Sequence, residues 1–272
     1  MSPPLRLYKY EAFTAQSLQN LKDQLIYFGS PLAFNDPYDC ALSPRIKEPT
    51  DVDVERVRSH YLAKPEIENR VRREFETASP AALRHMLLRI GQNTLDDMIT
   101  KFLSQRGVTC FSEKRDSLLM WSHYGDHCKG FCLEFSTSAD PFHKIKKVRY
   151  TQDMPVIDVV PMLCDEDYDP VVDLYCTKAI DWAYEHEWRA IHSQAGTAYR
   201  YPSESLTGIY LGPDMPFTAF EIIALVLAGQ NEHVQLWQGS RSKSNFSVEF
   251  RPVTYTSHLE AKRLGLLGTA DA

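Results

Sequence analysis

The sequence has no long apolar run and no excess of positive charge. It contains no stretch of about 18 apolar residues, so no membrane-spanning helix is expected. The Met-Ser-Pro-Pro start lacks the apolar core of a signal peptide, which predicts a cytoplasmic protein without membrane association. The formal net charge of −6 excludes a nucleic-acid surface that relies on overall charge alone, although a local basic groove stays open.

Cysteine is sparse and irregularly spaced. The six cysteines lie mostly inside apolar stretches, at positions 40, 110, 128, 132, 164 and 176. This distribution predicts reduced thiols without a structural disulfide. A zinc site at His123, His127, Cys128 and Cys132 is the alternative, but its spacings are too irregular for a common structural site. We therefore predict no metal site.

The composition is that of an ordinary globular protein, with 43% hydrophobic and 24% charged residues. There is no internal repeat and no low-complexity linker. Predicted strands are scattered among helices instead of alternating with them, which favours an α+β fold. We predict a single α+β domain over residues 1–272, with a helical insertion at about 51–106 lying against a β core. Within the insertion, Asn93 is a predicted cap between two helices.

Residue patterns along the rest of the chain predict further strands and helices. Thr14 is expected to cap the first helix. Predicted strands cover residues 5–10, 25–28, 108–111, 130–135, 146–150, 155–158, 206–211, 222–227 and 246–250. Short helices are predicted at 171–179 and 231–238 and after His258.

Residues 107–136 carry the densest group of candidate site residues. Two strand patterns flank residues 118–124, which have the length of two helical turns with Asp116 or Ser117 as the N-cap. Aromatic and hydroxyl side chains lie at the joints, where a small molecule can reach them: Ser112, Trp121, Ser122, His123 and Tyr124. The alternative is that Met120, Trp121 and Tyr124 fill a core.

Residues 182–191 form a second informative stretch. If the chain is a strand from Glu185 onward, Glu185, Glu187 and Arg189 share one face, whereas Trp188 and Ala190 share the other. Such a face suits a site that stabilises a cationic transition state. An exposed ion pair of little energetic value is the alternative.

The turn Phe34-Asn-Asp-Pro-Tyr-Asp39 is rich in side chains that bond to nearby backbone amides. We interpret Asn35 and Asp36 as turn-forming residues, and Asp39 as a residue that can face a pocket. A metal-dependent nuclease or hydrolase with oxygen ligands from Asp36, Asp39, Glu185 and Glu187 is one alternative function.

Four motifs in this order resemble the bacterial family known as domain of unknown function 2971, over about residues 5–230. They are LYKY (7–10), FNDPYD (34–39), CFSE (110–113) followed by MWSHYGDHCKGFCLEF (120–135), and the pattern W-x-Y-E-x-E-W-R (182–189). The name of this family carries no biochemical activity.

A looser similarity is to ADP-ribosyltransferases, whose fold is a split antiparallel sheet that binds NAD. The matching positions are Tyr8 (or Tyr10), Ser112 with Trp121–Tyr124, and Glu187; the first strand has tyrosine where transferases carry arginine or histidine. The pair Glu185-x-Glu187 resembles the motif of arginine-modifying members. The resemblance implies catalytic roles for Glu187, Glu185 and Tyr124. It implies NAD-binding roles for Tyr8, Lys9, Tyr10, Asp39, Ser112, Trp121, Ser122, His123 and Arg189.

The function expected from this similarity is cleavage of the nicotinamide–ribose bond of NAD, with transfer to a protein or nucleic-acid acceptor. Glu187 would stabilise positive charge on the ribose. Tyr124 or Tyr8 would stack on nicotinamide, while Arg189 and Lys9 would hold the pyrophosphate. A role in bacterial defence or as a toxin is expected, and a non-catalytic sensing or partner-binding module is the remaining alternative.

Overall fold

The computed structural model describes residues 2–138 and 140–266 of the chain. The described residues separate into two compact units. Unit 1 is drawn from Met1–Gly29, Gly107–Val148 and Ala183–Ala272, and unit 2 from Ser30–Arg106 and Arg149–Trp182. The helical segment at about residues 51–106 lies within unit 2. The single domain over residues 1–272 stays a prediction.

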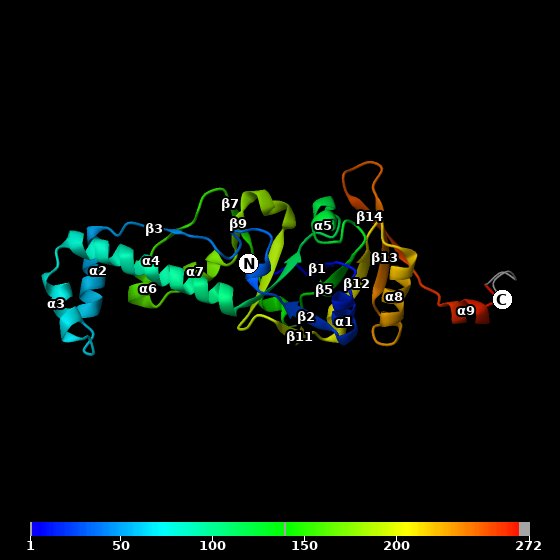
Figure 1. The fold of residues 1–272 in the computed structure, drawn as a ribbon, viewed down its shortest axis with the longest axis horizontal. Coiled ribbons are helices and arrows are strands. Elements are labelled where there is room, and N and C mark those ends of the chain that lie inside the picture. The colour runs from blue at the N-terminus through cyan, green and yellow to red at the C-terminus, as the bar shows by residue number, and fades with distance from the viewer. Residues whose placement is uncertain (1, 139, 267–272) are drawn as a thin grey trace. The chain divides into compact units, whose positions relative to one another are not determined.

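The described strands of unit 1 build an eight-stranded sheet in the order β14-β13-β12-β5-β1-β4-β10-β6 (Figure 1). These strands are β1 (Arg6–Glu11), β4 (Gly107–Ser112), β5 (Phe131–Ser136), β6 (Lys146–Lys147), β10 (Glu187–His192), β12 (Leu206–Leu211), β13 (Gln235–Arg241) and β14 (Val248–Val253). The sheet is mixed, because β12 and β13 are parallel while the other neighbours are antiparallel. Helix α8 (Phe217–Ala228) makes the crossover that a parallel pair requires. The α+β class is confirmed.

The remaining elements of unit 1 flank this sheet. Strand β2 (Leu25–Phe28) pairs with β11 (Thr197–Arg200). The helices are α1 (Ala15–Asp23), α5 (Leu118–His123) and α9 (His258–Arg263), with 3₁₀ turns at Phe142–Lys144 and Ser203–Ser205 and a third, Ile180–Glu185, at the junction with unit 2. Thr14 caps α1 and Ser117 caps α5, as predicted.

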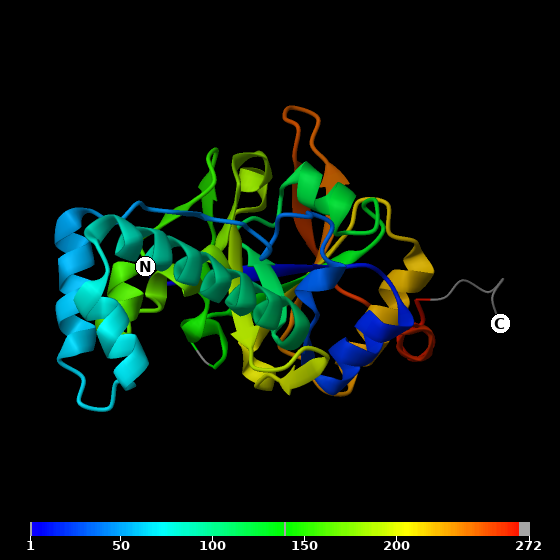
Figure 2. The same ribbon diagram turned by 60° about the vertical axis from the view of Figure 1, so that its left-hand side comes forward.

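One face of the sheet, here called the apolar face, holds the main hydrophobic core. Helices α1 and α8 pack on it through Leu21 and Ile223 (Figures 1 and 2). The sheet residues of the apolar face are Leu7, Phe111, Phe131, Leu133, Phe135, Trp188, Ala190, Leu206, Ile209 and Leu211. Successive side chains of a strand point to opposite faces, so alternate residues of β5 belong to this core, as do Trp188 and Ala190 of β10. On β12 a register shift between Leu206 and Gly208 interrupts the alternation.

The strand predicted at residues 222–227 is wrong, because these residues belong to α8. The helix buries Phe220, Ile223, Ala224 and Leu227, which recur at helical spacing, and leaves Ile222 exposed. A short apolar run does not distinguish a buried strand from a helix by itself. The helix predicted at 231–238 is also wrong, because residues 231–234 contain a turn and β13 begins at Gln235.

Unit 2 combines helices with two short parallel strand pairs. Its helices are α2 (Asp51–Leu62), α3 (Asn69–Thr77), α4 (Pro80–Gln105), α6 (Val160–Asp165) and α7 (Asp169–Leu174), with a 3₁₀ turn at Pro31–Ala33. The pairs are β3 (Arg45–Ile46) with β8 (Val156–Ile157), and β7 (Arg149–Thr151) with β9 (Thr177–Ala179). The helix predicted at 171–179 is therefore correct only for its first half.

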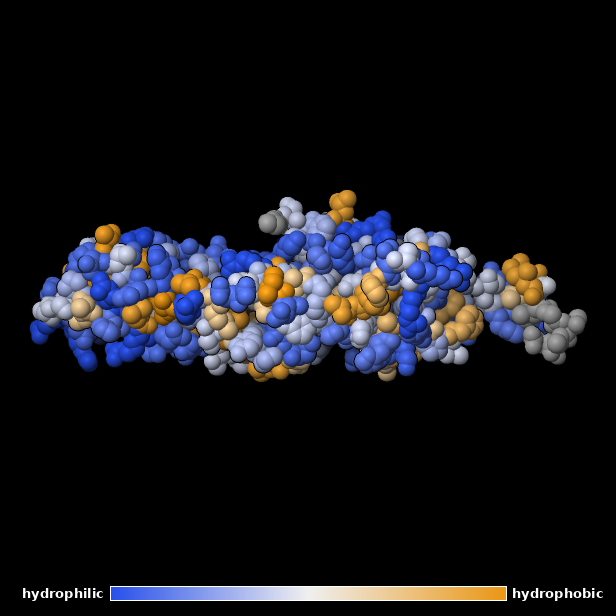
Figure 3. Space-filling view, turned by 90° about the horizontal axis from the view of Figure 1, so that it is seen from above, coloured by the Kyte–Doolittle hydropathy of each residue, from blue (hydrophilic) through white to orange (hydrophobic). Residues whose placement is uncertain are grey.

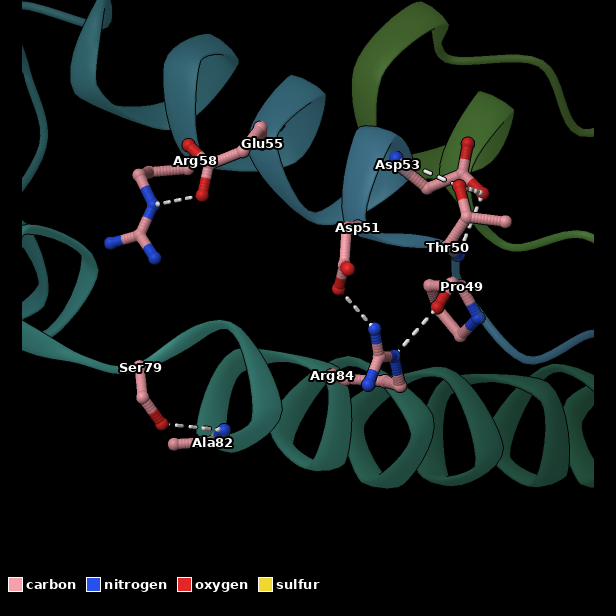
Figure 4. Close-up of polar contacts among 9 residues, drawn as sticks. All are labelled: Pro49, Thr50, Asp51, Asp53, Glu55, Arg58, Ser79, Ala82 and Arg84. Atoms are coloured by element: carbon pink, nitrogen blue, oxygen red, sulfur yellow. Dashed lines mark hydrogen bonds and ion pairs between the residues drawn. The ribbon is translucent and has the colours of Figure 1, made fainter.

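Polar side chains cap the first turns of α2 and α4 in unit 2 (Figure 4). Thr50 and Asp53 form a capping box at the start of α2, and Ser79 caps α4. Arg84 of α4 donates from Nε to the carbonyl oxygen of Pro49 at 2.8 Å and pairs with Asp51. These contacts join the start of α2 to α4.

Helix α4 is continuous, so the cap predicted at Asn93 is wrong. Its buried residues recur every three or four positions and form one stripe: Leu83, Leu87, Gly91, Leu95, Ile99 and Phe102. A Cβ on Gly91 would lie 3.0 Å from Val159 Cγ1, so glycine allows close packing within unit 2. Packing along this stripe outweighs the local preference of Asn93 for a helix end.

Candidate functional site

Four polar side chains form a row across adjacent strands of the main sheet. Glu134 on β5 is opposite Tyr8 on β1, Tyr8 is opposite Ser112 on β4, and Ser112 is opposite Glu187 on β10. Directly opposite residues share a face, with Cβ atoms about 4.5–5.5 Å apart. We call these four residues the polar row, and all four are buried.

The polar row lies on the face opposite the apolar face, here called the polar face. Tyr8 packs there in a second buried cluster with Tyr10, Cys132 and Tyr210. On β10, Glu187 and Arg189 point to this face, whereas Trp188 and Ala190 belong to the apolar face, as predicted. The strands β12, β5, β1, β4 and β10 thus have hydrophobic packing on one face and polar contacts on the other.

Arg189 holds the Glu187 carboxylate by a two-point contact. Its Nε donates to Oε1 at 2.6 Å and its Nη2 donates to Oε2 at 2.9 Å. Both side chains are buried, with exposed fractions of 0% for Arg189 and 5% for Glu187. A bidentate guanidinium–carboxylate pair fixes orientation as well as charge. Glu187 is therefore held in one position on the polar face.

Glu185 does not lie on the strand, which corrects the expectation that it shares a strand face with Glu187. It ends the 3₁₀ turn Ile180–Glu185, and His186 after it has a positive φ of 46°. Tyr124, which ends α5, donates its hydroxyl to Glu185 Oε1 at 2.6 Å. Ser112 Oγ donates to the backbone oxygen of Glu185, also at 2.6 Å. Both informative stretches of the sequence therefore meet at Glu185.

Residues 113–124 cover part of the polar face. The Tyr10 hydroxyl donates to the backbone oxygen of Lys114 at 2.8 Å, and its ring contacts the ring of Trp121 edge to face. Trp121 is completely buried and donates from Nε1 to the backbone oxygen of Arg115 at 2.7 Å. The side chain of Trp121 is therefore packed between this segment and the sheet, which agrees with the alternative that it fills a core.

The pattern of the sequence did not single out Arg115, Glu134 and Tyr210, which complete the polar face. Arg115 Nη1 donates to the Tyr8 hydroxyl at 3.1 Å and lies over the rings of Tyr8 and Tyr210, at 5.9 and 5.2 Å. Glu134 accepts from the Tyr210 hydroxyl at 2.8 Å and pairs with Arg6 at 3.1 Å. The alternation on β5 could have identified Glu134, but no pattern marks Arg115.

Burial raises the pKa of Tyr8, and the neighbouring Glu134 carboxylate adds to this effect while Arg115 opposes it. Burial also raises the pKa of Tyr210, and the hydrogen bond that its hydroxyl donates to Glu134 raises it further. Both hydroxyls consequently stay protonated at neutral pH and can donate hydrogen bonds.

Other predicted site residues lie elsewhere. Lys9 follows Tyr8 on β1 and therefore points to the opposite face of the sheet. Its ammonium lies 6.0 Å from the Phe111 ring centre and pairs with Glu11 at 3.3 Å. Ser122 and His123 are exposed on α5, where His123 contacts the rings of Tyr124 and Tyr184. The polar face therefore brings together Tyr8, Tyr10, Ser112, Trp121, Tyr124, Glu185, Glu187 and Arg189 of the predicted set.

Asp39 belongs to unit 2, where it is buried. Its Oδ2 pairs with Lys178 Nζ at 3.1 Å, and the Lys178 ammonium lies 4.6 Å from the ring centre of Trp182. This pair satisfies a carboxylate that would otherwise be costly to bury.

Within residues 2–138 and 140–266, no three His, Cys, Asp or Glu side chains are grouped closely enough to hold a metal ion. All six cysteines are free thiols. In the same part of the chain, none of the helices combines the length and hydrophobicity needed to cross a membrane. The surface seen in Figure 3 is mostly hydrophilic, with hydrophobic residues dispersed across it.

The fold and the polar row define an α+β protein whose mixed sheet carries buried ionisable groups on one face. Residues 120–190 match the model of the family described as "Protein of unknown function (DUF2971)". The matched range includes Tyr124, Glu134, Glu187 and Arg189. It begins after strands β1 and β4, which carry Tyr8 and Ser112. No curated protein and no solved structure matches the chain.

Proposed function

We propose that the protein is an ADP-ribosyltransferase-like enzyme that cleaves the nicotinamide–ribose bond of NAD. The observation that carries this proposal is the cross-strand register of Tyr8, Ser112 and Glu187 on β1, β4 and β10. These are the three positions at which the sequence resembles transferases, and they are far apart in the chain. Their alignment on one face supports a shared site.

Glu187 is the proposed stabiliser of the transition state. As the bond between the ribose C1′ and the nicotinamide nitrogen breaks, its electron pair leaves with nicotinamide and positive charge develops on the ribose. A carboxylate that is held in place by Arg189 stabilises that charge without reorganising. Because both groups are buried, solvent screens little of the attraction by Glu187 and little of the opposing charge of Arg189.

Glu185 and Tyr124 have the second proposed role. Glu185 is held by the Tyr124 hydroxyl at 2.6 Å, and Tyr124 is half-buried on α5. Water or an acceptor nucleophile then forms the new bond to C1′, and its proton passes to Glu185. The Tyr124 ring is the proposed surface on which nicotinamide stacks. The acceptor would be a protein or a nucleic acid, and hydrolysis by water would make the enzyme an NAD glycohydrolase.

The test measures nicotinamide released from NAD by the purified wild-type protein, by Glu187→Gln and by Glu232→Gln. Glu232 is an exposed residue of unit 1 and serves as the matched control. Glu187→Gln should lower the rate by about 10²–10³-fold per folded molecule, whereas Glu232→Gln should leave it unchanged. The folded fraction must be measured by circular dichroism, because breaking the buried pair with Arg189 also lowers stability.

Three outcomes would contradict this proposal. Release that needs added Mg²⁺ or Mn²⁺ would favour the metal-dependent hydrolase. Tight NAD binding without release would favour the sensing or partner-binding module. A wild-type protein that neither binds nor consumes NAD would remove the nucleotide chemistry altogether.

A further inference from the structure

Arg115 is held firmly although its side chain is exposed. Its backbone oxygen accepts from Trp121 Nε1 at 2.7 Å, and its guanidinium donates to the Tyr8 hydroxyl at 3.1 Å. The rings of Tyr8 and Tyr210 lie below the guanidinium at 5.9 and 5.2 Å. Aromatic faces attract a guanidinium, so this arrangement fixes a long side chain that would otherwise be mobile.

Arg115 has no carboxylate partner among the described residues, which it shares with the exposed Arg200 and Arg251 but not with three other arginines of unit 1. Arg6, Arg189 and Arg241 form ion pairs with Glu134, Glu187 and Asp214, respectively. Arg115 makes no ion pair within the described part of the chain, and a single side-chain hydrogen bond uses one of its several N–H donors. The remaining donors are therefore available to an anion.

The nearby Glu134 carboxylate does not neutralise Arg115 by direct contact. Its oxygens accept from the Tyr210 and Thr207 hydroxyls at 2.8 and 2.7 Å, and it pairs with Arg6 at 3.1 Å. Arg6 offsets part of the charge of Glu134, and the rest still acts on Tyr8 and Arg115 without direct contact with the guanidinium. Arg115 therefore feels a nearby carboxylate but has no direct ion pair among the described residues.

We propose that Arg115 binds a phosphate group of the ligand that occupies the polar face. Resting on the proposed function, this phosphate belongs to the diphosphate of NAD, and Arg115 supplies the cation that transferases carry on the first strand. Tyr8 stands at that strand position and anchors Arg115 through its hydroxyl. A planar guanidinium with several free donors matches the oxygens of a phosphate.

The test uses ADP-ribose, which keeps the diphosphate but lacks nicotinamide, and measures its dissociation constant by calorimetry. Arg115→Gln should weaken binding by about 10–100-fold, since a charge-assisted hydrogen bond is lost. Arg115→Lys should be intermediate, because it keeps the charge without the planar fork. Arg251→Gln is the matched control. Arg251 is exposed on β14, and it points away from the polar face because its neighbour Phe250 points toward that face. It should leave the constant unchanged.

The same titration separates this inference from the proposed enzyme activity. ADP-ribose binding that depends on Arg115, without nicotinamide release, would support the phosphate site and reject the enzyme. Nicotinamide release with an ADP-ribose constant that is the same in Arg115→Gln would reject the phosphate site. Failure of the wild-type protein to bind ADP-ribose would also overturn it. If Arg115→Gln does not fold, the comparison of Arg115→Lys with wild type decides.

Discussion

The apolar and polar faces of the main sheet come from the same strands but differ in what stabilises them. On β10, Trp188 enters the hydrophobic core, while its neighbour Glu187 meets Arg189 on the other side. On β5, Phe135 contacts the rings of Phe142 and Tyr201, whereas Glu134 accepts hydroxyl bonds. The apolar face gains stability by removing hydrocarbon from water.

On the polar face, stability depends on contacts that offset the cost of burying charges. Burying Glu134, Glu187 and Arg189 costs desolvation, which their mutual contacts offset only when geometry is good. A sheet can be covered on both faces by apolar residues at lower cost. Ligand chemistry is our proposal for why charged groups are buried on the polar face, and the following substitutions test the difference between the faces.

The largest effect is expected from the apolar face. Trp188→Ala removes a side chain that is only 2% exposed and leaves a cavity between the sheet and its covering residues. The free energy of unfolding should fall by about 3–5 kcal/mol, as measured by urea denaturation. Phe246→Ala is the control, because Phe246 is 98% exposed and its removal should change stability little. Similar losses for both variants would contradict the assignment of Trp188 to the core.

A smaller effect is expected from a polar contact. Tyr210→Phe keeps the ring but removes the hydroxyl that donates to Glu134 at 2.8 Å. The free energy of unfolding should fall by about 1.5–3 kcal/mol, because a buried carboxylate loses a donor. Tyr255→Phe removes a longer bond of 3.3 Å to Glu221 at the surface and should have little effect. A Tyr210→Phe variant as stable as wild type would show that Glu134 does not need this donor.

The smallest effect concerns alkaline pH. Burial raises the pKa of Tyr8, Tyr10, Tyr201 and Tyr210 above the ordinary value, so the folded state holds these protons more tightly than the unfolded state. Their contribution to stability is complete below about pH 10 and is lost as the pH rises through the folded-state values. Stability should therefore fall above about pH 10. Tyr201→Phe should flatten this slope by at most about 1.4 kcal/mol per pH unit.

Urea denaturation between neutral and alkaline pH, with tyrosinate absorbance as a second signal, measures this slope. The Tyr201 hydroxyl is a suitable probe, because it is buried and burial is the sole cause that raises its pKa. Stability that rises above about pH 10, or a slope that Tyr201→Phe leaves unchanged, would contradict the assignment of buried tyrosines.

Sequence patterns predicted the local elements that carry most of the candidate site. The alternation in β10 predicted that Glu187 and Arg189 share one face, and Ser117 is one of the two residues predicted to cap α5. Alternation is a local property, so it can be read without knowing the partner strand. The contact of Trp188 with the core follows from the same pattern.

The order and register of the strands could not be predicted. Tyr8, Ser112 and Glu187 are aligned only because β4 lies between β1 and β10. This arrangement depends on packing between segments about a hundred residues apart. Arg115 was missed because it lies in a loop without periodicity, and Glu185 was misplaced because the turn at His186 breaks the strand. Asp39 was predicted to face a pocket from its place just past a turn, and its pairing with Lys178 needs the fold of unit 2.

We propose that ligand chemistry belongs to the polar face, whereas the apolar face supplies stability. The direct measurement is nicotinamide release per folded molecule for the neighbouring substitutions Glu187→Gln and Trp188→Phe on β10. We expect Glu187→Gln to lose about 10²–10³-fold in rate. We expect Trp188→Phe to melt earlier but to keep the wild-type rate per folded molecule. Equal loss of rate in the two variants, or no loss in Glu187→Gln, would contradict this division between the faces.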